Sequence, residues 1–215
     1  MTPLMERLSS DFLPLVLGGM AVNFEIAVIA IAVGLAFGLL LAVGRLGGGM
    51  AGGAAASIIS VMRAAPTFVV MFFLLNAIPR DATVFGTPIA LSGIMTVALS
   101  LVPYSAAYIA DAGVDALRQL RGGSTLGALL FLPNVTRAFF VLVMSSSAGV
   151  AIGVTEGITV ILRQAEQLPT LDDRLALFAI GIVLFGTPLQ VGFAIMSFVQ
   201  RRLGRMVARS PADAA

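Results

Sequence analysis

Arg63 is the first residue whose chemistry stands out, because it is the only charge between residues 57 and 78. A charge in the middle of a bilayer costs about 2.5–3.5 kcal/mol on insertion scales, so its side chain must face a partner or water. Pro66 follows three residues later, where it would free a backbone carbonyl and kink a helix. An arginine beside a kink fits a gate or a ligand site. The alternative is that Arg63 snorkels to the membrane surface.

Hydroxyl and carboxyl groups form a second set of candidates. Ser145, Ser146 and Ser147 are consecutive in an apolar run. Serines in such a position either bond across helices as packing contacts or face a polar solute. Tyr108 and Asp111 are three residues apart, which places them on one face of a helix. Both readings stay open for the serines, and a buried face is expected for the tyrosine and the aspartate.

Composition excludes several classes of site. The chain contains no Cys, no His and no Lys. It therefore lacks a thiolate, an imidazole base or metal ligand, and a P-loop lysine. We expect no enzyme activity, and no metal or other cofactor bound by this chain. The 13 basic and 11 acidic residues are too evenly scattered to indicate a nucleic-acid partner.

The elements that must position these groups are membrane helices. Hydrophobic residues make up 59% of the 215 positions and charged residues 11%, against roughly 45–50% and about 25% in soluble domains. A helix needs about 20 apolar residues to cross a bilayer. The long uncharged runs therefore predict an all-α membrane protein with about five transmembrane helices, in one domain over residues 1–215. The predicted spans are 24–44, 57–78, 89–110, 138–155 and 175–200.

The arginines predict the orientation of these spans. With the N-terminus outside, eight arginines fall on the inner side and four on the outer side, and inner loops carry the positive excess. We therefore predict an N-out, C-in chain with a cytoplasmic loop over residues 112–137.

In the first span, Gly34 and Gly38 are four residues apart, a spacing that lets two helices approach closely.

Several short motifs follow one another along about residues 15–205. They are Arg63-Ala64-Ala65-Pro66, Phe72-Phe73-Leu74, Ala106-Ala107-Tyr108-Ile109-Ala110-Asp111, Leu132-Pro133, and Met144-Ser145-Ser146-Ser147-Ala148 followed by Gly153-Val154 and Glu156. In this order they resemble the permease subunit of ABC importers for polar amino acids, of the histidine, glutamine and arginine type. That family has Arg-Gly-Thr-Pro, an aromatic run, Ala-Ala-Tyr-x-Ala-Glu, Leu-Pro, and Lys-Asp-Thr-Ser-Leu before a Gly-Val and a Glu. The resemblance implies the permease fold of a type I ABC importer.

The resemblance and the intramembrane positions together nominate two groups of site residues. The predicted substrate pathway comprises Arg63, Tyr108, Asp111, Ser145, Ser146, Ser147 and Glu156. The predicted contact with an ATPase comprises Asp115, Arg118, Arg121, Gly122 and Gly123. In the family this contact is a short helix with the pattern Glu-Ala-Ala-x-x-x-Gly.

This chain departs from the family in two places. Met144 and Ser145 replace the Lys-Asp pair, and the segment between Asp111 and Leu132 is about a dozen residues shorter than the family's. Residues 112–120 are expected to form a short helix stopped by the glycine pair, a common helix end. The alternative is that residues 112–121 simply extend the third span.

The family resemblance also implies the partners. They are two ATP-binding ABC subunits, which would bind ATP and Mg²⁺, a second permease subunit, a periplasmic or extracellular solute-binding protein, and the lipid of a bacterial cytoplasmic membrane. The implied function is to form the translocation pathway of an ATP-driven importer for polar amino acids. The competing hypothesis is a diverged, permease-like membrane subunit with weakened or lost ATPase coupling, acting in assembly or regulation. A stand-alone channel or secondary carrier is disfavoured, since no strong internal repeat is visible.

Overall fold

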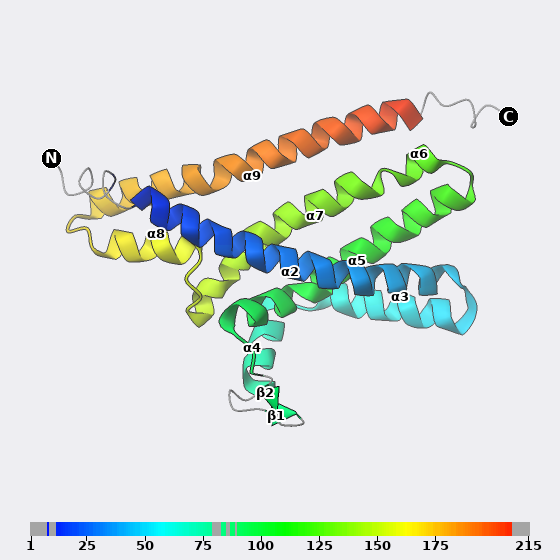
Figure 1. The fold of residues 1–215 in the computed structure, drawn as a ribbon, viewed down its shortest axis with the longest axis horizontal. Helices are drawn as coiled ribbons and strands as arrows, with labels where there is room; N and C mark the ends of the chain where they lie inside the picture. The colour runs from blue at the N-terminus through cyan, green and yellow to red at the C-terminus, as the bar shows by residue number, and fades with distance from the viewer. Residues whose placement is uncertain (1–7, 9–11, 79–82, 85–86, 89, 208–215) are drawn as a thin grey trace.

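The protein is described here by a computed structural model that covers residues 8, 12–78, 83–84, 87–88 and 90–207. Long helices run along a common axis, and a short arm stands out to one side (Figure 1). The elements are α2 (Phe12–Leu46), α3 (Gly49–Ala64), α4 (Thr67–Ala77), β1 (Thr83–Val84), β2 (Thr87–Pro88), α5 (Gly93–Arg121), α6 (Thr125–Ala128), α7 (Phe131–Ser145), the 3₁₀ helix η1 (Ser146–Ile152), α8 (Gly157–Glu166) and α9 (Leu171–Val207). The two short strands pair antiparallel.

Helices α2 and α5 form the centre of the bundle and pack closely along small residues. A Cβ built on Gly34 would lie 1.9 Å from Ser105 Oγ, and one on Gly38 would lie 2.7 Å from Ile109 Cβ. A Cβ on Gly113 would lie 3.0 Å from the Cβ of Ala42. Two glycines four residues apart thus let the second helix approach, as the spacing in the sequence predicts.

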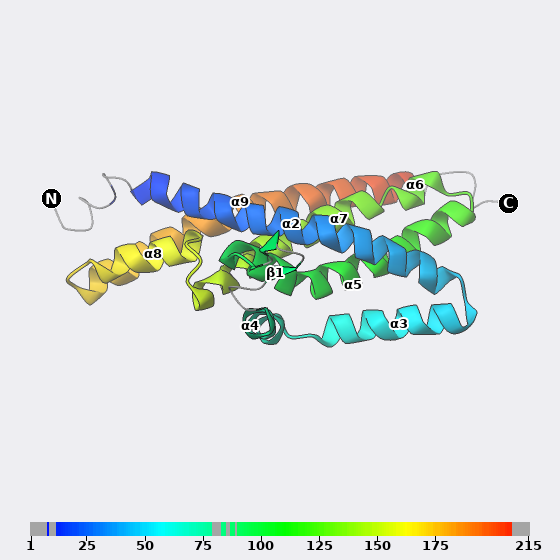
Figure 2. The same cartoon turned by 60° about the horizontal axis from the view of Figure 1, so that its bottom comes forward.

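The same contacts fix the relative direction of α2 and α5. Successive contacts advance in the same direction along both helices, from Gly34 with Ser105 to Ala42 with Gly113. The two helices are therefore parallel, so the chain between them must return to its starting end. Helix α3 makes this return beside α2 and α5 (Figure 2).

Four segments, α2, α5, α7 with η1, and α9, are long and apolar enough to cross a membrane. Helices α3 and α4 qualify only as a pair, and they are bent by 94° at a short break. Because α2 and α5 are parallel, we count this pair as one crossing. The count is then five, which confirms the predicted all-α architecture with about five spans.

The second span differs from the expected single helix over residues 57–78. Ala65 and Pro66 have extended backbones, with ψ angles of 114° and 126°. A residue before proline is pushed out of the helical region by a clash with the proline ring. The predicted kink is therefore a full break: α3 ends at Ala64, and α4 turns away to form the arm in Figure 1.

Most helices extend beyond the predicted spans. Helix α2 begins at Phe12 rather than at residue 24, and α5 continues to Arg121 rather than stopping near residue 110. Helix α9 covers 37 residues, Leu171–Val207, against the predicted 175–200. The predictions stopped near charges, but a helix tolerates charged residues where it leaves the apolar layer.

The segment between the third and fourth spans is also more helical than predicted. The loop expected over residues 112–137 reduces to residues 122–130, because α5 covers 112–121 and α7 begins at Phe131. A separate helix over 112–120 is wrong, and the alternative, an extension of the third span, is what the structure has. The glycine pair does end this helix: Gly122 is its C-terminal cap, and Gly123 has a left-handed φ of 82°.

The fourth span changes character half-way. Helix α7 tightens into η1 at Ser146, and Gly153, with a φ of 81°, ends the run. A sharp connection then leads into α8, a helix that was not predicted from the sequence. Helix α8 is amphipathic and packs against α2 and α9 at the end of the bundle that holds the start of α2.

Candidate functional site

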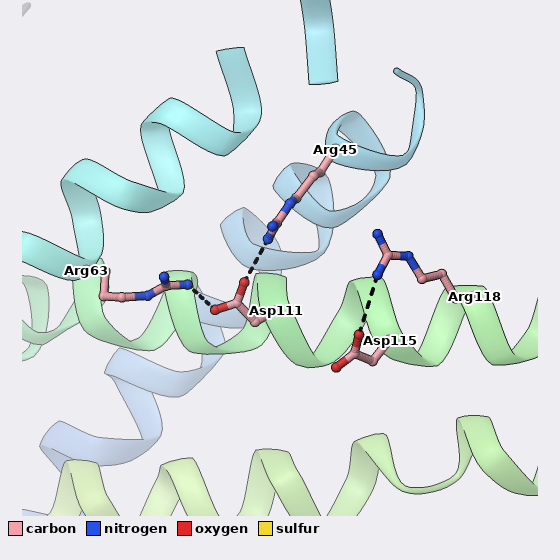
Figure 3. A network of polar contacts seen from close by, with 5 residues as sticks. All are labelled: Arg45, Arg63, Asp111, Asp115 and Arg118. Carbon is pink, nitrogen blue, oxygen red and sulfur yellow. Dashed lines mark hydrogen bonds and ion pairs between the residues drawn. The ribbon is translucent and has the colours of Figure 1, made fainter. Parts of the chain in front are cut away.

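Two polar clusters lie at different levels of the α2–α5 pair. The first joins three elements through one carboxylate (Figure 3). Arg45 is in the last turn of α2, Arg63 is in the last turn of α3, and Asp111 projects from α5 between them. We refer to these three residues as the arginine–aspartate cluster.

Asp111 accepts one hydrogen bond on each carboxylate oxygen. Arg45 Nη1 donates to Oδ1 at 2.9 Å, and Arg63 Nη2 donates to Oδ2. The side chains of Arg45, Arg63 and Asp111 are 38%, 59% and 39% exposed. A guanidinium has five N–H donors, and the cluster has two cations for one anion. It can therefore accept a further anionic or carbonyl group without losing its internal bonds.

Arg63 thus has a partner, as the cost of an intramembrane charge requires. Its side chain is also more than half exposed on the surface of this single chain. Sequence reasoning missed the second arginine, Arg45, because that residue only marked the end of the first span. Tyr108 lies one turn before Asp111 on α5, and its ring centroid is 6.2 Å from that of Tyr104.

The second cluster is buried and centres on Glu156, which has no exposed surface. One carboxylate oxygen accepts from the backbone N–H of Ile158 at 2.9 Å and from Asn23 Nδ2 at 3.1 Å. The other accepts from the backbone N–H of Thr159 at 2.9 Å. Glu156 is therefore the N-terminal cap of α8, a position where the helix dipole stabilises an acidic side chain.

Asn23 ties this cap to α2 and to the end of α7. Its amide donates to Ser146 Oγ at 2.8 Å, and its carbonyl oxygen accepts from the backbone N–H of Gly157 at 3.0 Å. Asn23 and Ser146 are both fully buried. We call Asn23, Ser146, Glu156 and Thr159 the capping cluster. It joins segments that are more than 120 residues apart in sequence.

The capping cluster changes the interpretation of two predicted pathway residues. Glu156 and Ser146 were predicted to lie along the substrate pathway, but in this chain their polar atoms are occupied by protein groups. The hydrogen bonds of Ser146 fit the packing alternative stated for the serines, and a place of Ser146 or Glu156 along the pathway stays a prediction. Asn23 was not predicted, although a polar residue within the apolar stretch before Glu25 is a signal that was available.

Ser147 accepts a longer hydrogen bond from the same Asn23 Nδ2, at 3.4 Å. Unlike Ser146 it is only half-buried, and it lines a cavity of about 350 Å³ between α7, η1, α8 and α9, together with Met144, Phe185 and Gln190. This volume is within the range of small-molecule sites, which are largely apolar with few polar groups. Ser145 is half-buried at the end of α7. Among the predicted serines, Ser147 is thus the one placed at a cavity.

The residues predicted to contact an ATPase lie together at the far end of α5. Asp115 and Arg118 form an i,i+3 pair at 4.0 Å, with side chains 79% and 65% exposed (Figure 3). Arg121, Gly122 and Gly123 are also exposed. The one-turn helix α6 follows, capped by Ser124, and it contacts α5 and α9. These residues form a solvent-exposed polar tip at the end of α5 rather than a separate docking helix.

Metal binding finds no support in the part of the chain that the structure describes. No group of three or more His, Cys, Asp or Glu side chains is placed there to hold a metal ion.

Comparison with solved structures identifies a known protein with a similar architecture. The chain is similar to a protein whose structure is described as an amino acid ABC transporter with histidines, with a TM-score of 0.68 and 18% sequence identity. The match covers 94% of this chain and 99% of that chain. No family model matches the sequence, and no curated protein matches it significantly. This likeness establishes the fold: a helical membrane protein with the architecture seen in that transporter.

Proposed function

We propose that this chain is the transmembrane permease subunit of an ATP-driven importer for polar amino acids, in a bacterial cytoplasmic membrane. The observation that carries the proposal is the fold likeness, because it extends over nearly the full length of both chains. The likeness therefore concerns the whole architecture and not only a pair of helices. The motifs from Arg63 to Glu156 support the same assignment.

ATP hydrolysis would take place in partner subunits. The chain has no lysine for a phosphate-binding loop. The exposed tip formed by the end of α5 and by α6 is the proposed contact with them. A coupled transporter must pass motion from its ATPases to its membrane helices through such a contact.

A second membrane subunit would complete the pathway. The arm formed by α4 carries exposed apolar side chains, with Phe68 52%, Val69 63% and Phe73 66% exposed. Ser147 and Gln190 at the cavity offer a hydroxyl and an amide, which can bond a zwitterionic solute without adding net charge. The arginine–aspartate cluster would supply donors for a carboxylate.

The test uses the full chain in its own host, with an affinity tag at its chromosomal locus. We expect an ABC ATPase and a second permease to co-purify in mild detergent. Proteoliposomes of this complex, with ATP inside and a solute-binding protein outside, should accumulate a labelled polar amino acid. Purification without an ATPase, together with unchanged amino-acid uptake after deletion of the gene, would refute the proposal.

The competing function, a permease-like subunit with weakened coupling, is favoured by one observation. Only nine residues, 122–130, separate α5 from α7, and α6 has just four residues. The same purification separates the two functions. A complex that contains the ATPase, but in which neither uptake nor ATPase activity responds to substrate and binding protein, would favour assembly or regulation.

A further inference from the structure

One face of α9 changes from apolar to basic near the end of the helix. The side chains of Val191, Ile195 and Phe198 are 53%, 52% and 54% exposed. Arg202 and Arg205 continue the same line, and both are exposed. Steps of four, three, four and three residues keep all five side chains on one face of an α-helix. Arg201 lies beside this line and is also exposed.

The opposite face of α9 is already occupied by the protein. Leu189 is 3% exposed, and a Cβ on Gly192 would lie 2.4 Å from the ring of Phe140 on α7. Gln200 donates a hydrogen bond to Asn134 on α7 at 2.9 Å. The apolar-to-basic face therefore points away from the bundle.

The three arginines are arranged for an external anion. Among the residues that the structure describes, the ion pairs involve Arg45, Arg63 and Arg118, and none involves the arginines of α9. The guanidinium of Arg202 lies 5.3 Å from the centroid of the Phe198 ring, a cation–π contact that holds it at the end of the apolar stripe.

We infer that this face of α9 is a binding site for an anionic phospholipid. The phosphate would lie among Arg201, Arg202 and Arg205, and an acyl chain would lie along Val191 and Ile195. A lipid is favoured because apolar and basic surface are continuous on one helix face. A soluble acidic protein would leave the apolar stripe uncovered, and free phosphate would not use that stripe.

The position along α9 agrees with this occupant. Residues 175–200 carry no charge, and at about 1.5 Å per residue they exceed the roughly 30 Å of a bilayer core. The arginines therefore begin where the helix reaches the headgroup layer. Basic side chains at that depth attract anionic lipid, by a factor on the order of five for each residue.

The experiment exploits the absence of tryptophan from the chain. Phe198→Trp places a single fluorophore in the site and keeps an aromatic ring beside Arg202. The full chain is reconstituted in phosphatidylcholine with phosphatidylglycerol, and quenching of the indole fluorescence is measured with one or the other lipid brominated. We expect a preference for phosphatidylglycerol of at least about fivefold. Raising salt from about 0.1 M to about 1 M should reduce it, as the screening length falls from about 10 Å to 3 Å.

Two matched double substitutions in this background decide the location of the site. Arg201→Gln with Arg205→Gln should bring the preference close to one. Arg118→Gln with Arg121→Gln removes the same charge from the tip of α5 and should leave the preference unchanged. Equal quenching by both lipids before substitution, or equal loss in both double variants, would overturn the proposal. Displacement of the lipid by millimolar phosphate would also overturn it, in favour of a free-anion site.

Discussion

The capping cluster and the arginine–aspartate cluster contrast in how completely their polar groups are paired. Glu156 is fully buried, and both of its oxygens accept bonds from the protein. Asp111 is 39% exposed and bonds two arginines whose other side-chain donors bond no acceptor among the residues that the structure describes. A closed network fixes geometry, whereas an open one can exchange partners. We therefore expect the capping cluster to have a structural role, and we expect ligand binding or gating at the arginine–aspartate cluster.

The α2–α5 interface connects these two regions. Asn23 of the capping cluster and Arg45 of the arginine–aspartate cluster are both on α2, and the glycine contacts lie between them. A substitution that changes how α2 packs on α5 should therefore affect both clusters.

The largest expected effect is at the capping cluster. Glu156→Ala should lower the free energy of unfolding by about 2–4 kcal/mol, because Asn23 and the N–H groups at the start of α8 lose a buried acceptor. Thermal melting of the purified chain in detergent measures this loss. The matched control is Glu166→Ala on the same helix, where the side chain is exposed, and its effect should stay within about 0.5 kcal/mol. Equal melting of the two variants would contradict the assignment of architecture to Glu156.

The α2–α5 contact should give the next largest effect. Gly34→Ala places a methyl group 1.9 Å from Ser105 Oγ and should destabilise the fold by about 1–3 kcal/mol. Ser105→Gly in the same chain should recover part of that loss, which a double-mutant cycle quantifies. Gly18→Ala serves as the control, since nothing lies within 4 Å of a Cβ there. If the two alanine variants melt alike, the helices do not pack as described.

The arginine–aspartate cluster should affect transport more than stability. Arg63→Ala removes a half-exposed ion pair and should change the free energy of unfolding by less than about 1 kcal/mol. Uptake by the reconstituted complex should fall by roughly fivefold, the equivalent of about 1 kcal/mol. Membrane abundance, measured in parallel, separates the two effects. Normal uptake at normal abundance would indicate that Arg63 only snorkels.

The smallest effect on folding is expected at the tip of α5. Asp115→Ala with Arg118→Ala removes an exposed pair worth about 0.5 kcal/mol or less. Stimulation of the ATPase by substrate and binding protein should nevertheless weaken in the assembled complex. A single cysteine at residue 118 should also crosslink to the ATPase. The crosslink can be assigned to this position because the chain has no native Cys. Unchanged stimulation together with no crosslink would show that coupling bypasses this tip.

Local signals predicted much of the fold. The uncharged runs located the membrane helices, the spacing of Gly34 and Gly38 indicated the close contact of the first span, and Pro66 indicated a kink in the second, where the structure has a full break. The paired glycines after Arg121 marked a helix end. Each of these signals acts within a few residues of its effect, so a single sequence is sufficient to read it.

The site residues were harder to predict because they are assembled over long distances in sequence. Asn23 and Glu156 are separated by 133 positions, and nothing local indicates that they meet. The extent of the break at Pro66 also depends on packing, since α3 lies against α2 and α5 while α4 does not follow that direction. How deeply a serine is buried depends on helix rotation: Ser146 and Ser147 both bond Asn23, but only Ser147 of these two also lines the described cavity.

The break between α3 and α4 has a consequence for biogenesis. Neither helix reaches the roughly 20 apolar residues that let a segment partition from the translocon into lipid by itself. Helix α3 packs on α2, which is synthesised before it, but α3 and α4 both also pack on α5, which is synthesised after them. The packing of α4 on α5 therefore forms only once Gly93–Arg121 has emerged from the ribosome. A chain truncated at residue 78 would lack these contacts of α3 and α4 with α5, and we expect it to be degraded faster than the full chain.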